Sequence, residues 1–356
     1  MENIQTILSN YTLETVAIYK KLSEVHRLLW ELKGLSESMP DQNILITTLS
    51  LQEAKESSAI ESIITTQDDL YKANIKGKNF SNQSVKEVHK YAEASLFWYS
   101  LIKKNELILI DDIIKIQSII EGNNIGIRKD RWTVILNETT NEVVYTPPQK
   151  YSDIMDLLED LERFINSNNT GIDPLIIMSI IHHQFESIHP FYDWNGRVWR
   201  IVNVLYLVKS WLLDTPILYH SRSINKHKSE YYKQLQSVRD NWSREDRILW
   251  MITMIEESAT HTLHIIKKIK IMMNSHKITI KTQSSKIYSH WLINNVFKFP
   301  YTKIQYLSHD IWCSKRTATK YLDELVRVWI LRKQKIWRES FYINIELLSL
   351  LKNISD

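Results

Sequence analysis

The stretch HPFYDWNGRVWR, residues 189 to 200, carries the side chains that chemistry at a phosphate group requires. His189 can take a proton near neutral pH. Asp193 offers a hard oxygen ligand of the kind that Mg²⁺ takes together with phosphate oxygens. Asn195 and Gly196 open an apolar helix, and the backbone N–H groups at a helix N-terminus bind anions.

Two arginines complete this set. Arg197 and Arg200 are three positions apart, so one helical face can present two guanidinium groups to a polyphosphate. Phe191 is interpreted as the plug that anchors the loop in the core. A base, a metal ligand, an anion-binding helix end and an arginine pair together indicate chemistry at a nucleotide phosphate.

Trp194 and Trp199 do not suit such a loop. A backbone that wraps around phosphates favours glycine, because a residue with a Cβ resists positive φ and blocks close approach to a phosphate. Trp194 therefore predicts that the chain as written binds ATP-like phosphates poorly. Trp199 is expected to matter less, since it falls in the first helical turn and can turn its side chain away.

Size and composition limit what surrounds this loop. A chain of 356 residues predicts two or three domains. With 44% hydrophobic and 24% charged residues it has the composition of a globular protein. The formal net charge of +4 and the pI near 8.8 permit contact with nucleic acid without requiring it.

The chain carries no mark of export or membrane insertion. Its one cysteine, Cys313, excludes an internal disulfide framework and fits a reducing compartment. The N-terminus lacks a basic segment followed by an apolar core, and no apolar run approaches the roughly 18 residues of a membrane span. We therefore expect a cytoplasmic protein without membrane contact; its oligomeric state stays open.

The elements that must position the loop are mostly helical. Residues 1 to about 120 predict helices, with a boundary at Pro40 before a possible cap at Asp41 and Gln42. Residues 131 to 148 differ, because two short β-prone runs flank a turn-rich segment, which indicates an inserted hairpin. Further helices are predicted at Tyr151 to Asn166, Asp173 to Ser187, Val198 to Leu213, Tyr231 to Arg239 and Arg247 to Lys270.

The C-terminal part changes in texture. Residues 277 to 285 are polar and are predicted to be a linker. A short helix near Ile304, a second from Ser314 to Arg327 and two strand-like runs follow, which is the order of a winged helix. A basic run could form a DNA-binding face or the solvated surface of a protein-binding module. It comprises Lys315, Arg316, Lys320, Arg327, Arg332, Lys333, Lys335 and Arg338.

HPFYDWNGRVWR resembles the Fic signature, HPFx(D/E)GNGRxxR. Fic proteins are helical, and most transfer AMP from ATP to a hydroxyl of a target protein. The stretch ESSAIES is similar to the family's inhibitory-helix pattern (S/T)xxxE(G/N), with Ser57 and Glu61 at the matching places. The hairpin at 131–148 resembles the flap that aligns a target segment by strand addition, and a winged-helix tail is a common companion.

The resemblance implies a role for each residue. His189 would deprotonate the target hydroxyl, Asp193 would hold Mg²⁺ against the α- and β-phosphates, and Arg200 would clamp the γ-phosphate. Glu61 would pair with Arg200 and inhibit, or would help remove AMP, as in some relatives. The other residues of the predicted nucleotide site are Trp194, Asn195, Gly196, Arg197, Val198, Trp199, a tyrosine near the adenosine (Tyr231), and Val144 and Tyr145 on the flap edge.

We therefore expect a mainly α protein in four parts. These are an N-terminal helical region (1–115) with an inhibitory helix at about 50–65, a Fic core (116–255) with flap 131–148 and motif 189–200, a helix and linker (256–285), and a winged-helix domain (286–356). ATP, Mg²⁺ and a target protein, which could be a second copy of the chain, are the expected partners. The alternative is a winged-helix regulator that binds DNA or protein and whose Fic domain is inactive.

The chain departs from the pattern at three places. Ser62 stands where the inhibitory pattern has Gly or Asn, Arg239 where some relatives have an asparagine near the nucleotide, and Trp194 where the signature has its first glycine. Glycine occurs 6 times and tryptophan 12 times, whereas roughly 7% of residues are glycine on average.

Several tryptophans fall where glycine is favoured. Trp98, Trp250 and Trp291 have apolar neighbours and are predicted to lie in the core. Seven others fall in the loop, before the first hairpin strand, or at predicted helix ends and turns. We hypothesise that one codon read here as tryptophan, such as UGA, encodes glycine in the source organism. The positions concerned are Trp132, Trp194, Trp199, Trp211, Trp312, Trp329 and Trp337.

Overall fold

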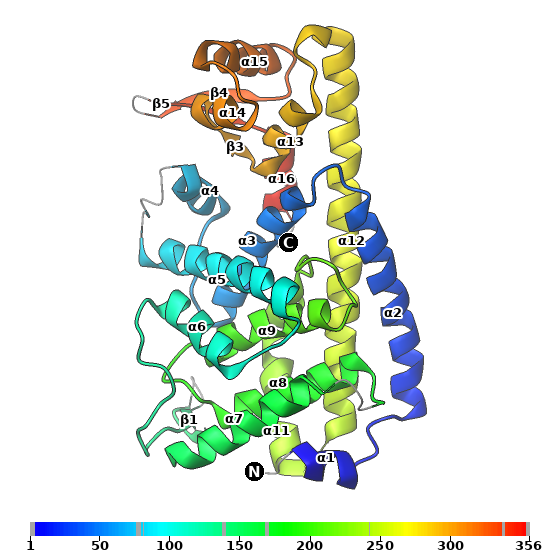
Figure 1. Cartoon of the computed structure of the whole chain (residues 1–356), viewed down its shortest axis with the longest axis vertical. Helices are drawn as coiled ribbons and strands as arrows, with labels where there is room; N and C mark the ends of the chain where they lie inside the picture. The colour runs from blue at the N-terminus through cyan, green and yellow to red at the C-terminus, as the bar shows by residue number, and fades with distance from the viewer. Residues whose placement is uncertain are drawn as a thin grey trace.

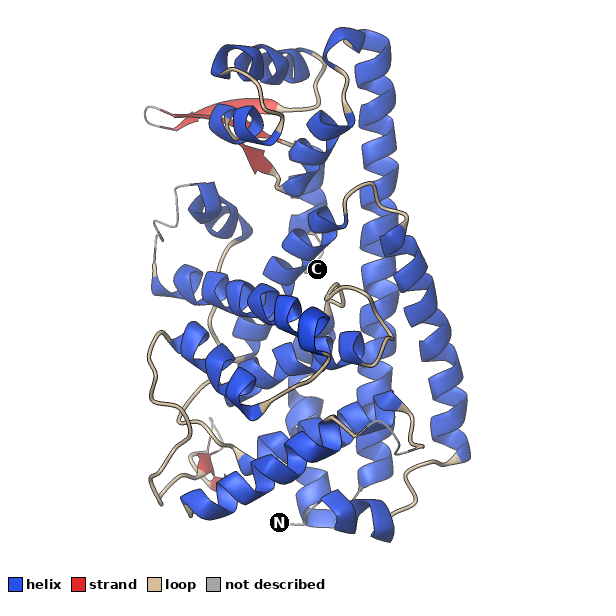
Figure 2. Cartoon of the chain, viewed as in Figure 1, coloured by secondary structure: helices blue, strands red, loops and turns tan. Residues whose placement is uncertain are grey.

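The computed structural model describes residues 4–75, 80, 82–136, 140–167, 171–241, 243–336 and 339–353. The protein is mainly α-helical with small sheets, as the sequence predicts (Figure 1, Figure 2). The helices are α1 (Ile4–Asn10), α2 (Val16–Glu37), α3 (Gln42–Ile60), α4 (Gln67–Ile75), α5 (Gln83–Asn105), α6 (Ile110–Glu121), α7 (Tyr151–Ile165), α8 (Pro174–Ile188), α9 (Asn195–Lys209), α10 (His220–Lys226), α11 (Lys228–Asn241), α12 (Arg244–Gln283), α13 (His290–Lys298), α14 (Ile304–Asp310), α15 (Lys315–Arg327) and α16 (Ile345–Lys352). A 3-10 turn, η1 (Ser285–Ile287), and the strands β1 (Ile135–Leu136), β2 (Val143–Tyr145), β3 (Tyr301–Thr302), β4 (Arg332–Ile336) and β5 (Glu339–Ile343) complete the fold.

The 40-residue helix α12 runs along one side of the molecule, with α2 beside it (Figure 1). Lys21 pairs with Glu256, and Lys267 pairs with Glu31, so the two helices run in the same direction. The predicted linker at 277–285 is wrong, because α12 continues without a break to Gln283.

The two helices on either side of the HPFYDWNGRVWR loop are buried. In α8, every residue from Leu175 to Ile188 is buried, the polar side chains of its C-terminal half included. Asp173 caps this helix by accepting a hydrogen bond from the Leu175 N–H at 2.9 Å, and Pro174 occupies its first position. Helix α9 is buried almost throughout as well. The loop between them is therefore fixed at both ends.

The inserted hairpin is present and short. Strands β1 and β2 are antiparallel, with Ile135 opposite Tyr145 and Leu136 opposite Val143, and a register irregularity between the pairs. Val143 is 58% exposed, so this small sheet keeps an accessible apolar side. The central residues of the predicted turn, 137–139, lie outside the described residues.

The C-terminal domain, residues 285 to 353, contains the predicted pair of helices, α14 and α15, and the predicted hairpin, β4–β5. The sheet order is β3-β5-β4; α13, β3 and α16 were not predicted. This domain packs onto the region of α3 and α4. The Tyr301 hydroxyl donates a hydrogen bond to Asp68 at 3.1 Å, and Lys352 pairs with Asp68 at 2.9 Å.

Among the described helices, none combines the length and the apolar character needed to cross a bilayer.

Three tryptophans directly follow helix ends in a left-handed conformation. Trp211, Trp312 and Trp329 have φ of +60°, +52° and +63°, and each comes one residue after the C-cap of α9, α14 or α15. In each case the next N–H bonds the carbonyl five residues earlier, at 3.0–3.1 Å, which defines a Schellman motif. Their indoles are 66–92% exposed, so little packing offsets the strain.

The other tryptophans differ in their surroundings. Trp98 is fully buried and Trp250 is partly buried against the core, as predicted. Trp291 is 70% exposed, so its predicted core position is wrong; it lies in the first turn of α13, whereas Leu292 and Ile293 beside it are buried. Trp337 lies outside the described residues.

We predict that Trp329→Gly raises the free energy of unfolding by about 1 kcal/mol, because glycine removes the cost of a left-handed L-residue. Chemical denaturation monitored by circular dichroism measures the change. Trp30→Gly is the matched control: Trp30 is also exposed, at 65%, but lies inside α2, so glycine should lower stability there. A loss of stability in both variants would contradict the prediction.

Candidate active site

The loop between α8 and α9 is closed by its own asparagine. The Asn195 amide accepts a hydrogen bond from the Phe191 N–H and donates one to the Phe191 carbonyl, both at 2.9 Å. Phe191 is buried and packs against Phe185, as expected of a plug. The Asn195 side chain therefore braces the loop, and its contacts are with the loop backbone.

His189 ends α8 in a left-handed conformation, with φ of +48°. Its N–H bonds the Phe185 carbonyl at 2.9 Å. Burial, reinforced by the positive charges of Arg128 and Arg239, lowers the pKa of His189 to about 4. The imidazole is therefore neutral at pH 7, which is the protonation state that a general base requires.

Arg128, which sequence reasoning missed, holds this loop from behind. Its guanidinium has no exposed surface and donates to the carbonyls of Ile188, His189 and Pro148. One side chain thus ties the end of the hairpin segment to the residue expected to act as the base. In the sequence Arg128 is the first of four charged residues, Arg128 to Arg131, and such a charged run says nothing about carbonyl partners.

Arg239 makes a second link between the hairpin and α8. Its guanidinium carbon lies 4.0 Å from the centre of the Tyr145 ring in β2. The same group donates to the Glu186 carbonyl at 3.3 Å and to the Ser187 hydroxyl at 3.4 Å. Tyr145 is thus held against the His189 region, while Val144 is 37% exposed beside it.

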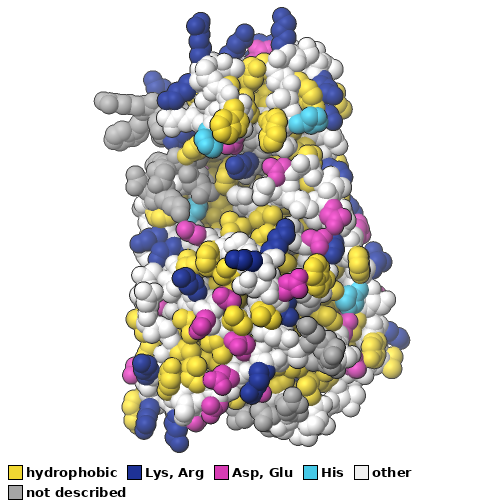
Figure 3. Space-filling model, viewed as in Figure 1, with side chains coloured by type: hydrophobic (Ala, Val, Ile, Leu, Met, Phe, Trp, Pro, Cys, Tyr) yellow, Lys and Arg dark blue, Asp and Glu magenta, His cyan; other side chains and the backbone are white. Residues whose placement is uncertain are grey.

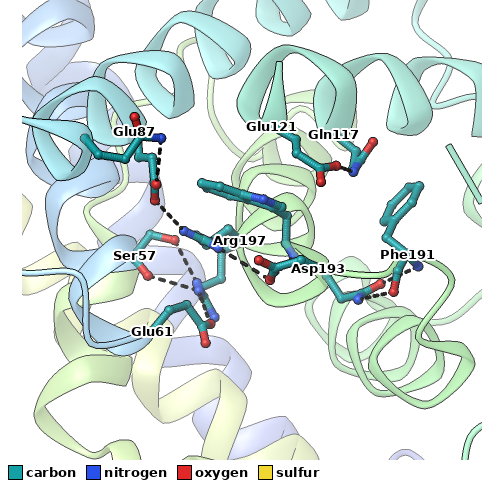
Figure 4. Close-up of polar contacts among 12 residues, drawn as sticks. Ser57, Glu61, Glu87, Gln117, Glu121, Phe191, Asp193 and Arg197 are labelled. Atoms are coloured by element: carbon teal, nitrogen blue, oxygen red, sulfur yellow. Dashed lines mark hydrogen bonds and ion pairs between the residues drawn. The ribbon is translucent and has the colours of Figure 1, made fainter. Parts of the chain in front are cut away.

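Residues 57 and 61 meet Arg200, as the resemblance predicts. Ser57 and Glu61 lie four residues apart on one face at the end of α3 and point toward α9 (Figure 4). Arg200 Nη2 donates to Glu61 Oε1 at 2.7 Å and to the Ser57 carbonyl at 3.0 Å, and its Nε donates to the Ser57 hydroxyl at 2.8 Å. Arg200 Nη1 is buried without a partner among the described residues.

The Glu61 carboxylate lies where the first turn of α9 would bind an anion. A Cβ added to Gly196 would come 2.9 Å from Arg200 Nη1 and 3.0 Å from Glu61 Oε1. Glycine at this position therefore leaves the space in which the two charged groups meet, beside backbone N–H groups without helical acceptors. Burial raises the pKa of Glu61, but Arg200 more than reverses this and keeps it below its usual value.

Arg197 is covered and already paired. Its guanidinium carbon lies 3.1 Å from the centre of the Trp194 ring. Its nitrogens pair with Glu87 at 3.3 Å and with Asp193 at 3.5 Å (Figure 4). Trp194 itself has φ of +74° and is 8% exposed. The indole thus lies over a cation that the resemblance assigns to phosphate binding.

Asp193 suits a metal ion that is also coordinated by phosphate oxygens better than one coordinated by protein side chains alone. Its side chain is 68% exposed, and Oδ1 accepts the Trp194 N–H at 2.6 Å. In the described part of the chain no group of three His, Cys, Asp or Glu side chains could hold a metal. One accessible carboxylate beside an anion site fits Mg²⁺ that arrives with phosphates, since Mg²⁺ usually takes one or two carboxylates plus phosphate oxygens.

The remaining predicted site residues lie behind this surface. Tyr231 is buried, and its hydroxyl lies 3.0 Å from His182 Nε2. His182 also contacts Asn203 through Nδ1 at 2.6 Å, so it bridges α8, α9 and α11. Val198 is buried inside α9, and Trp199 stacks on Phe185 at 4.2 Å. None of these three predicted nucleotide-site residues, Tyr231, Val198 and Trp199, is accessible.

Three family models match the chain. Residues 19–97 match the Fic/DOC family N-terminal region, residues 105–207 match the Fic/DOC family, and residues 272–347 match the C-terminal domain of SoFic-like protein adenylyltransferases. The chain belongs to the Fic/DOC family.

Known relatives agree with this assignment. Over 111 residues the chain is 30% identical to protein adenylyltransferase fic-1 of Caenorhabditis elegans, a match that covers 31% of this chain and 21% of that protein. A Fic family protein from Desulfovibrio desulfuricans G20 has the same fold, with a TM-score of 0.58, 18% identity, and coverage of 94% of this chain and 97% of the other. A segment of Fic-1 from C. elegans gives a TM-score of 0.52 at 20% identity, with 70% and 73% covered.

We predict that Trp194→Gly raises the affinity for Mg·ATP by about tenfold or more, because it uncovers Arg197 and lets the loop backbone approach a phosphate. Isothermal titration calorimetry measures this. Trp211→Gly is the control, since it relieves the same kind of strain at the far end of α9 and should leave the affinity unchanged. Equal gains in both variants would mean that general stabilisation, and not the loop, is responsible.

Proposed function

We propose that this chain transfers AMP from ATP to a hydroxyl side chain of a target protein, Ser, Thr or Tyr, and that Glu61 holds this activity off. One observation carries the proposal: the Glu61 carboxylate lies beside Gly196 in the first turn of α9 and accepts a hydrogen bond from Arg200 at 2.7 Å. The matches to the Fic/DOC family and to a protein adenylyltransferase support the reaction class.

In the proposed reaction the target hydroxyl attacks the α-phosphorus of ATP, and its proton passes to the neutral His189. The bond between the α-phosphorus and the β-phosphate oxygen breaks, so pyrophosphate leaves and AMP remains as an ester on the target. Arg200 would hold the γ-phosphate and Arg197 the anion hole. Asp193 would hold Mg²⁺, which neutralises developing charge on the phosphates when it is bound with them.

The target segment would lie along the hairpin. The exposed side of β1–β2 can accept a strand, and main-chain hydrogen bonds would align a target whatever its sequence. A hollow of about 510 Å³ beside the hairpin is lined by residues 129–133 and Tyr192. The Tyr192 hydroxyl accepts the Lys129 N–H at 3.1 Å, so this hollow is attached to the loop that carries His189.

Inhibition would act by substitution. With Glu61 in place, Nε and Nη2 of Arg200 donate hydrogen bonds to Ser57 and Glu61. The space beside Gly196 then holds a carboxylate instead of a phosphate. Nucleotide then binds without the γ-phosphate clamp, which misplaces the α-phosphorus for attack. The same carboxylate could direct water at an AMP ester, so removal of AMP stays the alternative direction for this site.

We predict that His189→Ala lowers AMP labelling by about 100-fold or more, the usual contribution of a general base. The assay uses ATP labelled at the α-phosphate, Mg²⁺ and the Trp194→Gly chain as the parent, with labelling of the chain itself as the readout. The affinity for Mg·ATP should be unchanged, because the neutral imidazole carries no charge to the phosphates. Labelling that persists in the alanine variant would remove His189 from the mechanism.

We predict that Glu61→Gly raises labelling on the order of tenfold or more, which corresponds to the loss of one charge-assisted hydrogen bond to Arg200. Glu61 is the C-cap of α3, so glycine is tolerated there. Ser62→Gly is the adjacent control: Ser62 has φ of +62° and does not contact Arg200, so glycine should stabilise α3 without raising labelling. Equal activity of the Glu61→Gly chain and its parent would argue against inhibition by Glu61.

The C-terminal domain supports a second function, binding of duplex DNA, which would be the main one if Trp194 abolishes ATP binding. Lys315, Arg316 and Lys320 are exposed on α15. Basic side chains project from the end of the molecule where α15 lies (Figure 3). The carboxylates of Asp323 and Glu324 nearby are neutralised by Lys333 and Arg327, each at 2.7 Å.

We predict that Arg316→Ala and Lys320→Ala weaken duplex DNA binding and each reduce the salt slope by about 1, because each removes a phosphate contact. Fluorescence anisotropy at several salt concentrations measures both quantities. Lys104→Ala, at the end of α5, is the control and should change neither. Absence of duplex binding at low salt would leave a protein partner as the remaining assignment for this surface.

A further inference from the structure

Four tryptophans share a backbone conformation that L-amino acids avoid. Trp194, Trp211, Trp312 and Trp329 have φ between +52° and +74°. Ten of the twelve tryptophans lie in the described part of the chain, so four in ten of these are left-handed. In proteins generally only a few per cent of non-glycine residues are, mostly Asn, Asp and His. Tryptophan is thus concentrated at the positions least suited to its shape.

Each of these positions demands glycine for a local reason. Trp211, Trp312 and Trp329 occupy the residue after a C-cap in three separate Schellman motifs, where glycine is the usual occupant. Trp194 opens α9 at the anion site, where a side chain covers Arg197. The chain uses glycine in the same way elsewhere: Gly122 ends α6 with φ of +83° and bonds the Ser118 carbonyl at 2.8 Å.

The other residues give the contrast. The remaining non-glycine residues with positive φ in the described chain are of four different types: Ser62, Glu106, Asn141 and His189. Trp98, by comparison, has ordinary backbone geometry and no exposed surface, as a genuine core tryptophan should. Substitutions accumulated at random would neither select one residue type nor seek out left-handed positions. A codon that means glycine in the source cell but is translated here as tryptophan would place a single residue type at positions with left-handed backbones.

We propose that the protein made in its source cell carries glycine at positions 194, 211, 312 and 329, encoded by UGA codons that are read here as tryptophan. The proposal rests on backbone geometry, and it extends to the function as follows. With glycine at 194 the loop reads GNGR, Arg197 is uncovered, and the first turn of α9 becomes an open site for the phosphates of a nucleotide. This last step alone depends on the proposed function.

Backbone strain is absent at some of the suspected positions. Trp132 and Trp199 have φ outside the left-handed region. Trp199 is also fully buried and stacked on Phe185. Backbone strain therefore assigns four positions. Trp132, Trp199 and Trp337, the last of which lies outside the described residues, need the codon itself.

The test is peptide mass spectrometry of the protein purified from its source cells, together with the codons of its gene. The expected result is glycine in the peptides that contain positions 194, 211, 312 and 329, with UGA codons, and tryptophan at Trp98 with a UGG codon as the internal control. Tryptophan in any of the four peptides, or UGG at any of the four codons, overturns the proposal for the chain. Neither the peptide masses nor the codons depend on AMP transfer. The assignment of glycine can therefore fail or succeed independently of the proposed function.

A recombinant comparison gives a second readout. A chain with Trp211→Gly, Trp312→Gly and Trp329→Gly should melt several degrees above the chain as written, measured by differential scanning calorimetry. A chain with Trp30→Gly, Trp98→Gly and Trp291→Gly carries the same number of glycines at residues without left-handed backbones, and it should melt lower. Destabilisation by the first set would overturn the claim that these backbones are built for glycine.

Discussion

One buried guanidinium organises the centre of this protein. Arg200 has no exposed surface, and a charge removed from water must find partners. The end of α3 supplies them through Ser57 and Glu61, so α3 has to pack against α9. The same face of α3 is held one turn earlier, where Glu53 accepts the Ser221 N–H at 2.8 Å. The helix that carries Glu61 is therefore part of the core.

Features with a short-range signature could be predicted from sequence. The spacing of Ser57 and Glu61 puts both on one helical face, and a cap such as Asp173-Pro174 marks a helix start wherever it occurs. Two β-prone runs around turn residues were enough to predict β1 and β2. Three of the tryptophans that were predicted to lie at helix ends, where glycine is favoured, do lie there with positive φ. This could be predicted because Schellman motifs depend on local backbone alone.

Features that depend on partners far away in the chain could not be predicted from sequence. Arg128 and Arg239 act mainly through backbone carbonyls, which every residue has, so sequence does not reveal the match. The predicted linker is helical because Met273, His276 and Ile280 keep the spacing of a buried face, whereas average polarity over nine residues suggested a loop. Trp291 has apolar neighbours in sequence, but α13 turns it outward.

The missing Cβ of Gly196 leaves room for only one of two competing anions. The space beside Gly196 can hold the Glu61 carboxylate or a phosphate, but not both. Glu61 Oε1 already lies 3.0 Å from the point that a Cβ of residue 196 would occupy. Under the proposed function, Glu61 would act as a tethered competitor whose strength is set by its effective concentration, which dissolved nucleotide would have to exceed. Under such competition the degree of restraint follows the cellular nucleotide level, so the same chain would be restrained in a starved cell and released in an energy-rich one.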